Sequence, residues 1–283
     1  MKTLGLGLVI SMGLVGLASG CDEDPANNTS ATTTATTGVT TTTTATTTTT
    51  TTTSASTGSS MGGSGGSGGE PGVEILDPTV DHYGMSAQEW AAAWWQWVYG
   101  TPATGHPLFD ETGADCHTGQ SGEVFFLGGT FGGEPVTRAC TIGDDKAVFF
   151  PVVNSTCFDP MDQFTDLELQ GFSTSFIEAI DDMSVEIDGT LYDKNALFPT
   201  YRVGLYHAYF TVAATDDLFT YWGAPFDLSG AILETFGDGV YLMLAPLPLG
   251  EHVIKIYALE DNDTPTDATD DFVVDVTYNL TVE

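Results

Sequence analysis

The chain has 283 residues, and its 6 Lys and Arg against 39 Asp and Glu give a formal net charge of −33. So acidic a chain repels nucleic acid and anionic membrane surfaces, and it offers no basic patch for phosphate contacts. We therefore expect no nucleic-acid partner.

The first twenty residues predict a secretion signal, with Lys2, an apolar run at 4–17 and small residues before Cys21. The run is too short to span a bilayer stably. The sequence LASGC resembles the bacterial lipobox, in which the cysteine receives a diacylglyceryl group, and this implies that Cys21 is lipidated. We expect an exported protein, lipid-anchored in the bacterial cell envelope, with the inner and the outer membrane both open.

Residues 21–70 are expected to form a disordered tether. A threonine run at 46–53 precedes a glycine and serine stretch at 62–69. Neither part has apolar periodicity, so neither can bury enough surface to offset the entropy of ordering. The glycine-rich part is a flexible linker. Residues 71–283 remain as a single globular domain, long enough to bury one sizeable core.

The stretch SAQEWAAAWWQWVYG, residues 86–100, holds four of the five tryptophans and predicts a helix over about 86–99. Ser86 and Glu89 have the spacing of a capping box, and the alanines that follow favour helix. At about 100° per residue, three tryptophans share one face, which we expect to be core. These residues are Trp90, Trp94 and Trp97.

The other side of this helix carries candidate ligand-binding residues. Trp95 and Tyr99 point away from the core stripe and, together with Gln96, would form an aromatic platform for a ligand. His106, in the loop that follows, is a further ligand-binding candidate. The alternative is that a second layer of structure covers Trp95 and makes it part of the core.

The rest of the domain reads as short strands and turns with a second helix. That helix is expected at about 166–182, after a capping box of Thr165 and Glu168. Pro151 places its strand at a sheet edge or at a bulge. The expected strands are 123–127 and 136–142, joined by a glycine-rich turn, then 147–153, a hairpin at 184–191 with Asp188-Gly189 in the turn, 201–213, 240–245, 252–259 and 272–282. Strands at this spacing favour a mainly β fold, an antiparallel β-sandwich of Ig-like or jelly-roll-like type with two added α-helices.

Three cysteines remain after Cys21, and in an exported protein two of them should pair. We expect the disulfide Cys116–Cys140, because these residues bracket the hairpin expected at 123–142 and its lead-in loop. Cys157 is then left over. No C-x-x-C spacing occurs, which argues against a metal held by cysteines.

No enzyme motif stands out in the chain. It lacks G-x-S-x-G, H-E-x-x-H and a glycine-rich phosphate loop, and its five histidines are not paired at metal-ligand spacing. The acidic loop 260–271 lacks the EF-hand pattern and predicts a solvated hairpin loop. Its Asp261, Asp263 and Asp267 are weak candidates for binding Ca²⁺, and no other cofactor is expected.

Several sequence blocks together carry a resemblance to a known family. In order, they are EWAAAWWQWVYGTPATGHPLFDETGADC, GQSGEVFFLGGTFGG, TRACTI, KAVFFPVVNSTC and YLMLAPLPLGEHVIKI. From Met85 onward the chain is similar to an uncharacterised family of secreted bacterial proteins marked by an AEWSAKWWQW-like helix. The resemblance implies an exported domain and transfers no catalytic residue. Relatives often carry a cysteine near Gly171; its absence here leaves Cys157 without that partner and favours the pairing Cys116–Cys140.

We expect a surface-anchored lipoprotein that displays a non-catalytic extracellular binding domain, because display is what a long flexible stalk provides. Its partners would be the membrane, through the lipid, and an extracellular glycan or protein. One alternative is a secreted polysaccharide hydrolase or lyase with its site between the tryptophan helix and the loop 101–121. A structural envelope protein is another. Converging carboxylates and aromatics in a pocket would favour the enzyme, whereas an open aromatic strip would favour the binding domain.

Overall fold

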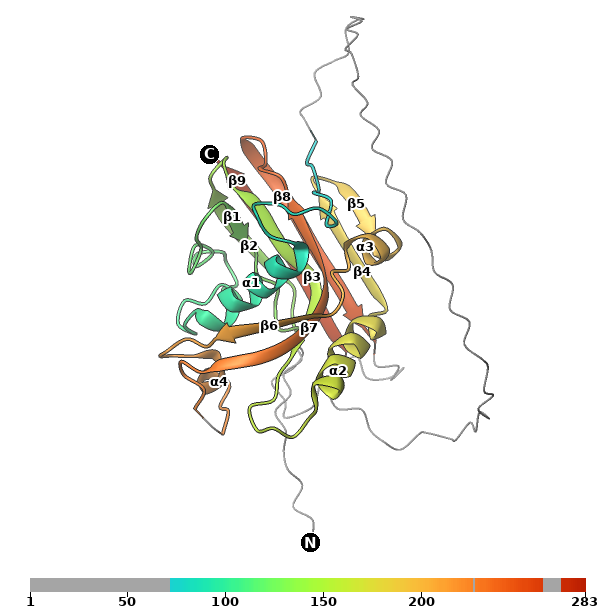
Figure 1. Ribbon diagram of the computed structural model, residues 1–283. Coiled ribbons are helices and arrows are strands. Elements are labelled where there is room, and N and C mark those ends of the chain that lie inside the picture. The colour runs from blue at the N-terminus through green and yellow to red at the C-terminus, as the bar shows by residue number, and fades with distance from the viewer. Residues whose placement is uncertain (1–71, 226, 262–270) are drawn as a thin grey trace, which may run out of the picture. The chain divides into compact units, whose positions relative to one another are not determined.

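The computed structural model describes residues 72–225, 227–261 and 271–283, which belong to one compact unit (Figure 1). The expected signal peptide, Cys21 and the tether at 21–70 lie outside the described residues and stay predictions. No helix in the described part of the chain is long and apolar enough to cross a membrane. The elements are α1 (Ala87–Gly100), β1 (Val124–Phe126), β2 (Val136–Ile142), β3 (Ala147–Cys157), α2 (Asp166–Ala179), β4 (Asp182–Ile187), β5 (Thr190–Asp193), α3 (Lys194–Tyr201), β6 (Tyr206–Thr211), α4 (Leu218–Tyr221), β7 (Ile232–Leu244), β8 (Gly250–Glu260) and β9 (Phe272–Val282).

The strands form two sheets, and both sheets are mixed. One has the strand order β1-β3-β7-β6, and the other has the order β2-β9-β8-β4-β5. The pairs β1–β3 and β2–β9 are parallel, and the remaining pairs are antiparallel. The mainly β fold is confirmed, whereas the expectation of purely antiparallel sheets is wrong. The hairpin expected at 123–142 does not form, because β1 and β2 join different sheets.

Apolar side chains fill a core on each face of the four-stranded sheet. One core lies between the two sheets, with α2 and α3 at its side, and the other lies beneath α1 (Figure 1). In β3, Val148 and Phe150 face the first core, and Ala147 and Phe149 face the second. Because both faces are covered, the run AVFFPVV is continuously apolar instead of alternating. The strand is central and its register shifts after Pro151, so a bulge, and not an edge, accommodates this proline.

Both expected helices are present, each with its capping box. Ser86 and Glu89 start α1, and Thr165 and Glu168 start α2. The second helix ends at Ala179, before residue 182, because β4 begins there. Two short helices, α3 and α4, were not expected. Each begins after an aspartate whose side chain accepts a hydrogen bond from a backbone N–H of the first turn.

The hairpin of β4 and β5 is confirmed. Asp188 and Gly189 have φ values of 48° and 82°, and a tight two-residue hairpin turn requires positive φ at both positions. The pair β8–β9 is antiparallel from Gly250 to Glu260. As expected for 272–282, β9 alternates between buried and more exposed residues, because one face of its sheet packs on the core and the other faces solvent.

The disulfide Cys116–Cys140 is confirmed and joins the loop after α1 to β2. Cys157 lies at the end of β3, where it is fully buried. No cysteine among the described residues is a free thiol. The expectation that Cys157 is left over is therefore wrong.

Candidate functional site

The tryptophan stripe of α1 packs against the four-stranded sheet and fastens the surrounding loops. Trp94 and Trp97 are buried, as expected, and Trp90 is half-buried. Each indole N–H donates to a backbone carbonyl oxygen of a different segment. The pairs are Trp90 with His82 at 2.8 Å, Trp94 with Leu127 at 3.0 Å and Trp97 with Thr118 at 2.9 Å.

The aromatic platform expected on the other side of α1 is not exposed, so that prediction is wrong. Trp95 is 1% exposed and Tyr99 is 0% exposed. The ring of Tyr99 stacks on Trp95, Phe210 and Phe219, with centroid distances of 5.3, 4.3 and 5.3 Å. The strand β6 and the helix α4 thus form the second layer that covers this side of the helix, and Trp95 is core.

Gln96 closes a sheet edge and does not face a ligand site. Its Oε1 accepts from the backbone N–H of Thr211 at 2.8 Å, and its Nε2 donates to the carbonyl of Thr211 at 3.0 Å. Thr211 lies on β6, an edge strand. At the opposite edge, Gln120 makes the same pair of bonds to Phe126 of β1, at 2.9 and 2.8 Å. Each side-chain amide takes the place of a neighbouring strand at an otherwise open edge.

His106 is also buried, with 1% of its surface exposed. Its Nδ1 accepts from the N–H of Leu108 at 3.1 Å, so its Nε2 carries the proton that is donated to the carbonyl of Val98 at 3.0 Å. Burial lowers the pKa of His106 to about 4. The neutral ring packs against Phe109 at 5.4 Å, whose N–H donates to the His106 carbonyl at 3.0 Å. His106 is therefore a support for the turn that presents Phe109.

Four aromatic side chains come together at the surface on three loops, and we call them the aromatic cluster: Phe109, Phe131, Tyr221 and Trp222. Phe109 is central, with its ring centroid 4.7 Å from Tyr221, 5.4 Å from Phe131 and 6.3 Å from Trp222. Phe131 and Trp222 meet edge to face at 4.9 Å. Tyr221 is 62% exposed, and the other three rings are half-buried. The cluster therefore presents one exposed ring, that of Tyr221, beside three half-buried rings that pack against the core beneath α1.

Of the three segments that carry the cluster, the first is the loop that follows α1, the second is the loop that joins β1 to β2, and the third comprises α4 and the residues around it. The first is tied to the third, because the N–H of Thr104 donates to a carboxylate oxygen of Asp216 at 2.8 Å. Buried Asp217 caps α4 by accepting from the N–H of Thr220 at 3.0 Å. Burial acts to raise the pKa of Asp217, but hydrogen bonds led by that of Ser229 outweigh it and lower the pKa. The carboxylate therefore stays ionised and holds the loop of Tyr221 in place.

Asp110, beside Phe109 in the chain, is engaged inside its own loop. One carboxylate oxygen accepts from the N–H and the hydroxyl of Thr112, both at 2.8 Å, and the other accepts from the N–H of Asp115 at 2.8 Å. Burial acts to raise the pKa of Asp110, but these hydrogen bonds outweigh it and lower the pKa. The general acid of a glycosidase needs a raised pKa. Asp110 is thus suited to closing the loop and not to donating a proton.

The aromatic cluster was not predicted from the sequence. Phe131 sits in the glycine-rich stretch GGTFGG, and Tyr221-Trp222 is followed by a glycine. Large aromatic residues beside glycines and outside any periodic segment were the available signal. That signal does not say that these loops meet, because contacts between distant loops depend on the fold that brings them together.

One cysteine and histidine group has the proximity of a metal site in the described residues. The ligand atoms of Cys116, His117 and Cys140 lie within 4.8 Å of one another. Both sulfurs belong to the disulfide, however, and a disulfide offers no thiolate to a metal. Of the Ca²⁺ candidates, Asp263 and Asp267 lie outside the described residues. Asp261 directly follows β8, its N–H donates to a carboxylate oxygen of Asp181 at 2.8 Å, and the Ca²⁺ site stays a prediction.

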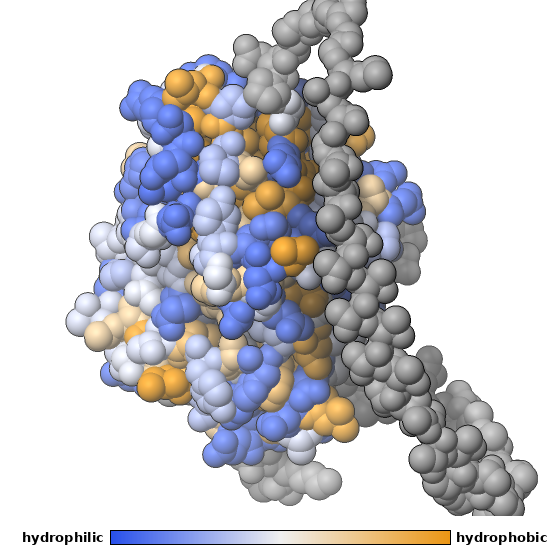
Figure 2. Space-filling view, turned by 45° about the horizontal axis from the view of Figure 1, so that its top comes forward, coloured by the Kyte–Doolittle hydropathy of each residue, from blue (hydrophilic) through white to orange (hydrophobic). Residues whose placement is uncertain are grey.

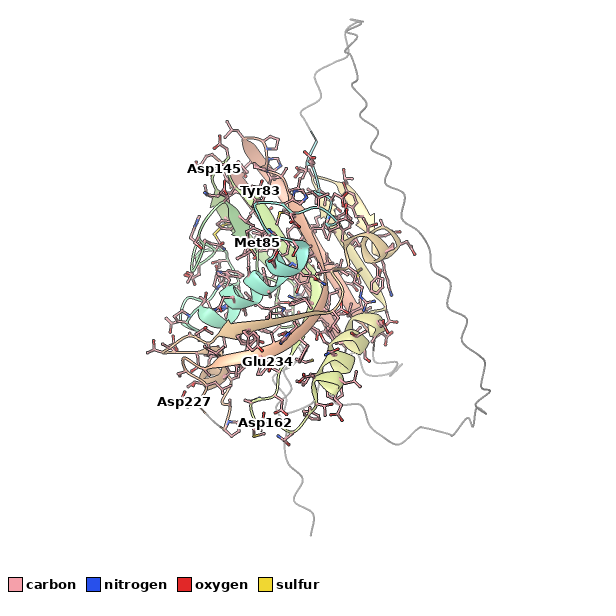
Figure 3. The ribbon with its side chains drawn as sticks, in the orientation of Figure 1. Tyr83, Met85, Asp145, Asp162, Asp227 and Glu234 are labelled. Atoms are coloured by element: carbon pink, nitrogen blue, oxygen red, sulfur yellow. A yellow bond between two sulfur atoms is a disulfide. The ribbon has the colours of Figure 1, made fainter. Side chains whose placement is uncertain are left out.

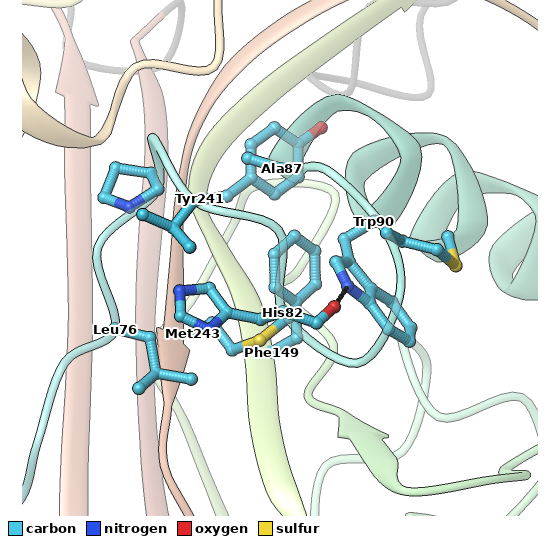
Figure 4. A pocket seen from close by; sticks show the side chains of 10 residues that line it. Leu76, His82, Ala87, Trp90, Phe149, Tyr241 and Met243 are labelled. Carbon is cyan, nitrogen blue, oxygen red and sulfur yellow. Dashed lines mark hydrogen bonds between the residues drawn. The ribbon is translucent and has the colours of Figure 1, made fainter. Parts of the chain in front are cut away.

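A small pocket lies beside the start of α1 (Figure 4). Mainly apolar side chains line it, including Leu76, Met85 and Met243, and the carbonyl of His82 at its rim accepts from the Trp90 indole. The cavity volume is ≈ 20 Å³, whereas ligand pockets span roughly 300–1,000 Å³. This pocket has room for about one water molecule and not for a sugar.

A second exposed tyrosine lies away from the cluster. Tyr209 on β6 is 59% exposed, and its hydroxyl donates at 2.9 Å to Glu234 of β7. Figure 3 labels this glutamate. His207 contacts the same carboxylate oxygen at 2.7 Å. Elsewhere, hydrophobic side chains occur in small patches among hydrophilic ones on the face shown in Figure 2, as on most soluble domains. Tyr209 provides a comparison residue of similar exposure to Tyr221.

Comparisons with known proteins leave the family open. No family model matches the chain, and no curated protein matches it. Among solved structures, the solution structure of Amebosin matches with 13% sequence identity and a TM-score of 0.14, over 53% of this chain and 100% of that one. A TM-score this low carries no argument about fold or function.

Proposed function

We propose that this protein is a surface-anchored lipoprotein with a non-catalytic binding domain, and that the aromatic cluster binds a neutral glycan. The observation that carries the proposal is the cluster itself, with Tyr221 62% exposed at the end of α4. Tyrosine and tryptophan combine an apolar ring with a polar tip. They suit a ligand that is apolar on one face and polar at its edges, as a sugar ring is.

The charge of the chain supports a neutral ligand over an anionic one. The formal net charge is −33, which repels anionic polysaccharides at low salt. Arg138 bonds to the backbone on both sides of Phe109, and its side chain is buried and bonded to backbone carbonyls. Among the described residues, no cationic side chain lies over a ring of the cluster, so none is offered there to a uronic acid or a sulfate group.

The position of the cluster in the fold supports a role in display. The two sheets face each other across a shared core, and we interpret this as a β-sandwich variant, a scaffold of the kind that presents loops at its ends. The described chain begins at residue 72, at the end of the molecule away from α4 (Figure 1). Residue 72 and the end of α4 that carries Tyr221 therefore lie at different ends of the described domain. The resemblance to secreted bacterial proteins is consistent with such a role.

The test is glycan binding by the purified full-length protein and two tyrosine variants. Wild-type protein, Tyr221→Ala and Tyr209→Ala would be run in affinity gels with xyloglucan, mixed-linkage β-glucan and the anionic control alginate, and hits would be quantified by calorimetry. We expect a neutral glycan to bind. Tyr221→Ala should weaken binding by about 30-fold, the effect of losing one aromatic anchor, and Tyr209→Ala, which removes a similarly exposed ring, should not.

Other outcomes would overturn the proposal in different ways. Equal losses of glycan affinity in Tyr221→Ala and Tyr209→Ala would show that the cluster is not the binding site. Release of new reducing ends from a bound glycan would favour the hydrolase or lyase. Absence of binding to any glycan would leave the structural envelope role as the better account.

A further inference from the structure

Arg138 is a buried cation on the inward side of β2. It is 1% exposed, and no carboxylate of the described residues forms a salt bridge with it. An unpaired buried charge is costly unless hydrogen bonds compensate it. Its guanidinium therefore has to be satisfied by neutral acceptors, and the identity of these acceptors shows what the residue does.

The first set of acceptors brackets Phe109. The Nε of Arg138 donates to the carbonyl of Asp110 at 2.6 Å, and its Nη2 donates to the carbonyl of Leu108 at 3.1 Å. These carbonyls belong to the residues directly before and after Phe109. Two donors held in one rigid plane thus fix the backbone on both sides of the central ring of the aromatic cluster.

The second set of acceptors leads to Phe131. The Nη1 of Arg138 lies 2.8 Å from the carbonyl of Gly128, 3.0 Å from that of Gly129 and 2.8 Å from the hydroxyl of Tyr278. That hydroxyl also donates to the carbonyl of Gly128 at 2.8 Å and accepts from its N–H at 3.0 Å. The loop that presents Phe131 is thereby anchored just before the ring, by Arg138 and Tyr278 together.

We infer that Arg138 is the positioning residue of the aromatic cluster: a single guanidinium holds the loop of Phe109 and the loop of Phe131 in one arrangement. Trp222 contacts both of these rings, at 6.3 and 4.9 Å. If loss of the guanidinium displaces Phe109 or Phe131, the contacts of Trp222 in the third loop therefore change as well. A lysine could not replace it, because an ammonium lacks the planar fork of five donors. The consequence for glycan binding rests on the proposed function, whereas the consequence for loop geometry does not.

Fluorine NMR of full-length protein labelled with 5-fluorotryptophan tests the inference. The five tryptophans give five resonances, and the loss of one in Trp222→Phe assigns Trp222. The variants are Arg138→Lys and Tyr278→Phe. Tyr278→Phe removes a single oxygen, and we expect it to fold even if Arg138→Lys does not. The matched control is Tyr241→Phe, which removes the hydroxyl of a buried tyrosine whose partner is Tyr206, on β6.

We expect Tyr278→Phe to shift and broaden the Trp222 resonance while the resonance of Trp95, in the core beneath β6, stays in place. Arg138→Lys should do the same or more, and Tyr241→Phe should leave Trp222 unchanged. An unmoved Trp222 in Tyr278→Phe would overturn the inference, and so would five resonances moving together, since that reports only a general loss of packing.

Glycan titrations of the same samples separate this inference from the proposed function. If the wild type binds a neutral glycan, Tyr278→Phe should weaken it by about tenfold, the effect of one lost buried hydrogen bond on an affinity. Unchanged affinity with a shifted Trp222 would overturn the link to binding. If the Trp222 resonance shifts but the wild type binds no glycan, the positioning role of Arg138 is supported and only the proposed function is contradicted.

Discussion

Lowering the pH should destabilise this protein through His106 in a way that can be isolated. The folded protein holds the imidazole neutral, with a pKa of about 4, whereas an unfolded chain titrates it near its ordinary value of about 6.5. Between these two values the unfolded chain binds the proton and the folded protein does not. Stability is therefore present above pH 6.5 and is lost as the pH falls toward 4.

The magnitude follows from the two pKa values. From pH 7 to pH 5, the free energy of unfolding should fall by about 2 kcal/mol on account of this one group, and by about 3 kcal/mol when the pH reaches 4. Because the ring is 1% exposed, solvent screening does not reduce the effect much. A loss of 2 kcal/mol is large beside a total stability of about 5–15 kcal/mol.

Urea unfolding of wild-type protein and of His106→Gln, at pH 7 and at pH 5, measures this term. Glutamine does not titrate, and carboxylates with lowered pKa, such as Asp110 and Asp217, contribute equally to both proteins. We expect the wild type to lose about 2 kcal/mol more than the variant between the two pH values. Parallel losses, or an NMR titration that places the folded pKa of His106 near 6.5, would refute the reasoning.

Three further predictions concern the helix, the sheet edges and the anchor. Trp95→Ala should cost roughly 3–5 kcal/mol in urea unfolding, as much as Trp94→Ala, because both rings are core; a near-neutral Trp95→Ala would contradict the packing of β6 and α4 over the helix. Gln96→Ala and Gln120→Ala should each expose a strand edge and cause concentration-dependent association in light scattering, while Gln88→Ala, whose amide reaches only the carbonyl of Leu205, should not. Cys21→Ala should move the protein from the membrane to the soluble fraction, and unchanged membrane association would sink the lipid anchor.

The elements that depend on local pattern could be predicted from the sequence. A capping box needs residues three apart, and a tight hairpin turn needs two residues that accept positive φ. Hence Ser86 with Glu89 marks the start of α1, and Asp188-Gly189 forms the turn of the β4–β5 hairpin. The alternation of 272–282 likewise predicts β9, since one face of its sheet is covered and the other is solvated.

Strand pairing could not be predicted, because it depends on partners that are distant in the chain. The segments 123–127 and 136–142 both have strand character, and a glycine-rich turn between them favours a hairpin. In the fold, β1 pairs with β3 and β2 pairs with β9. A disulfide expected from that hairpin was nevertheless right, since Cys116 reaches β2 by crossing from the loop after α1.

The candidate site likewise has features that follow from local sequence pattern and features that depend on tertiary contacts. Composition and order determined the excess of acid, the tryptophan helix and the burial of Trp94 and Trp97, because these depend on residue type and spacing alone. Only the tertiary structure decided that β6 and α4 cover Trp95, that Gln96 closes a strand edge, and that the Arg138 guanidinium bonds to backbone carbonyls beside both Phe109 and Phe131. A side chain is exposed or buried according to what packs on it, and the β6 residue that bonds to Gln96 is 115 residues away in the chain.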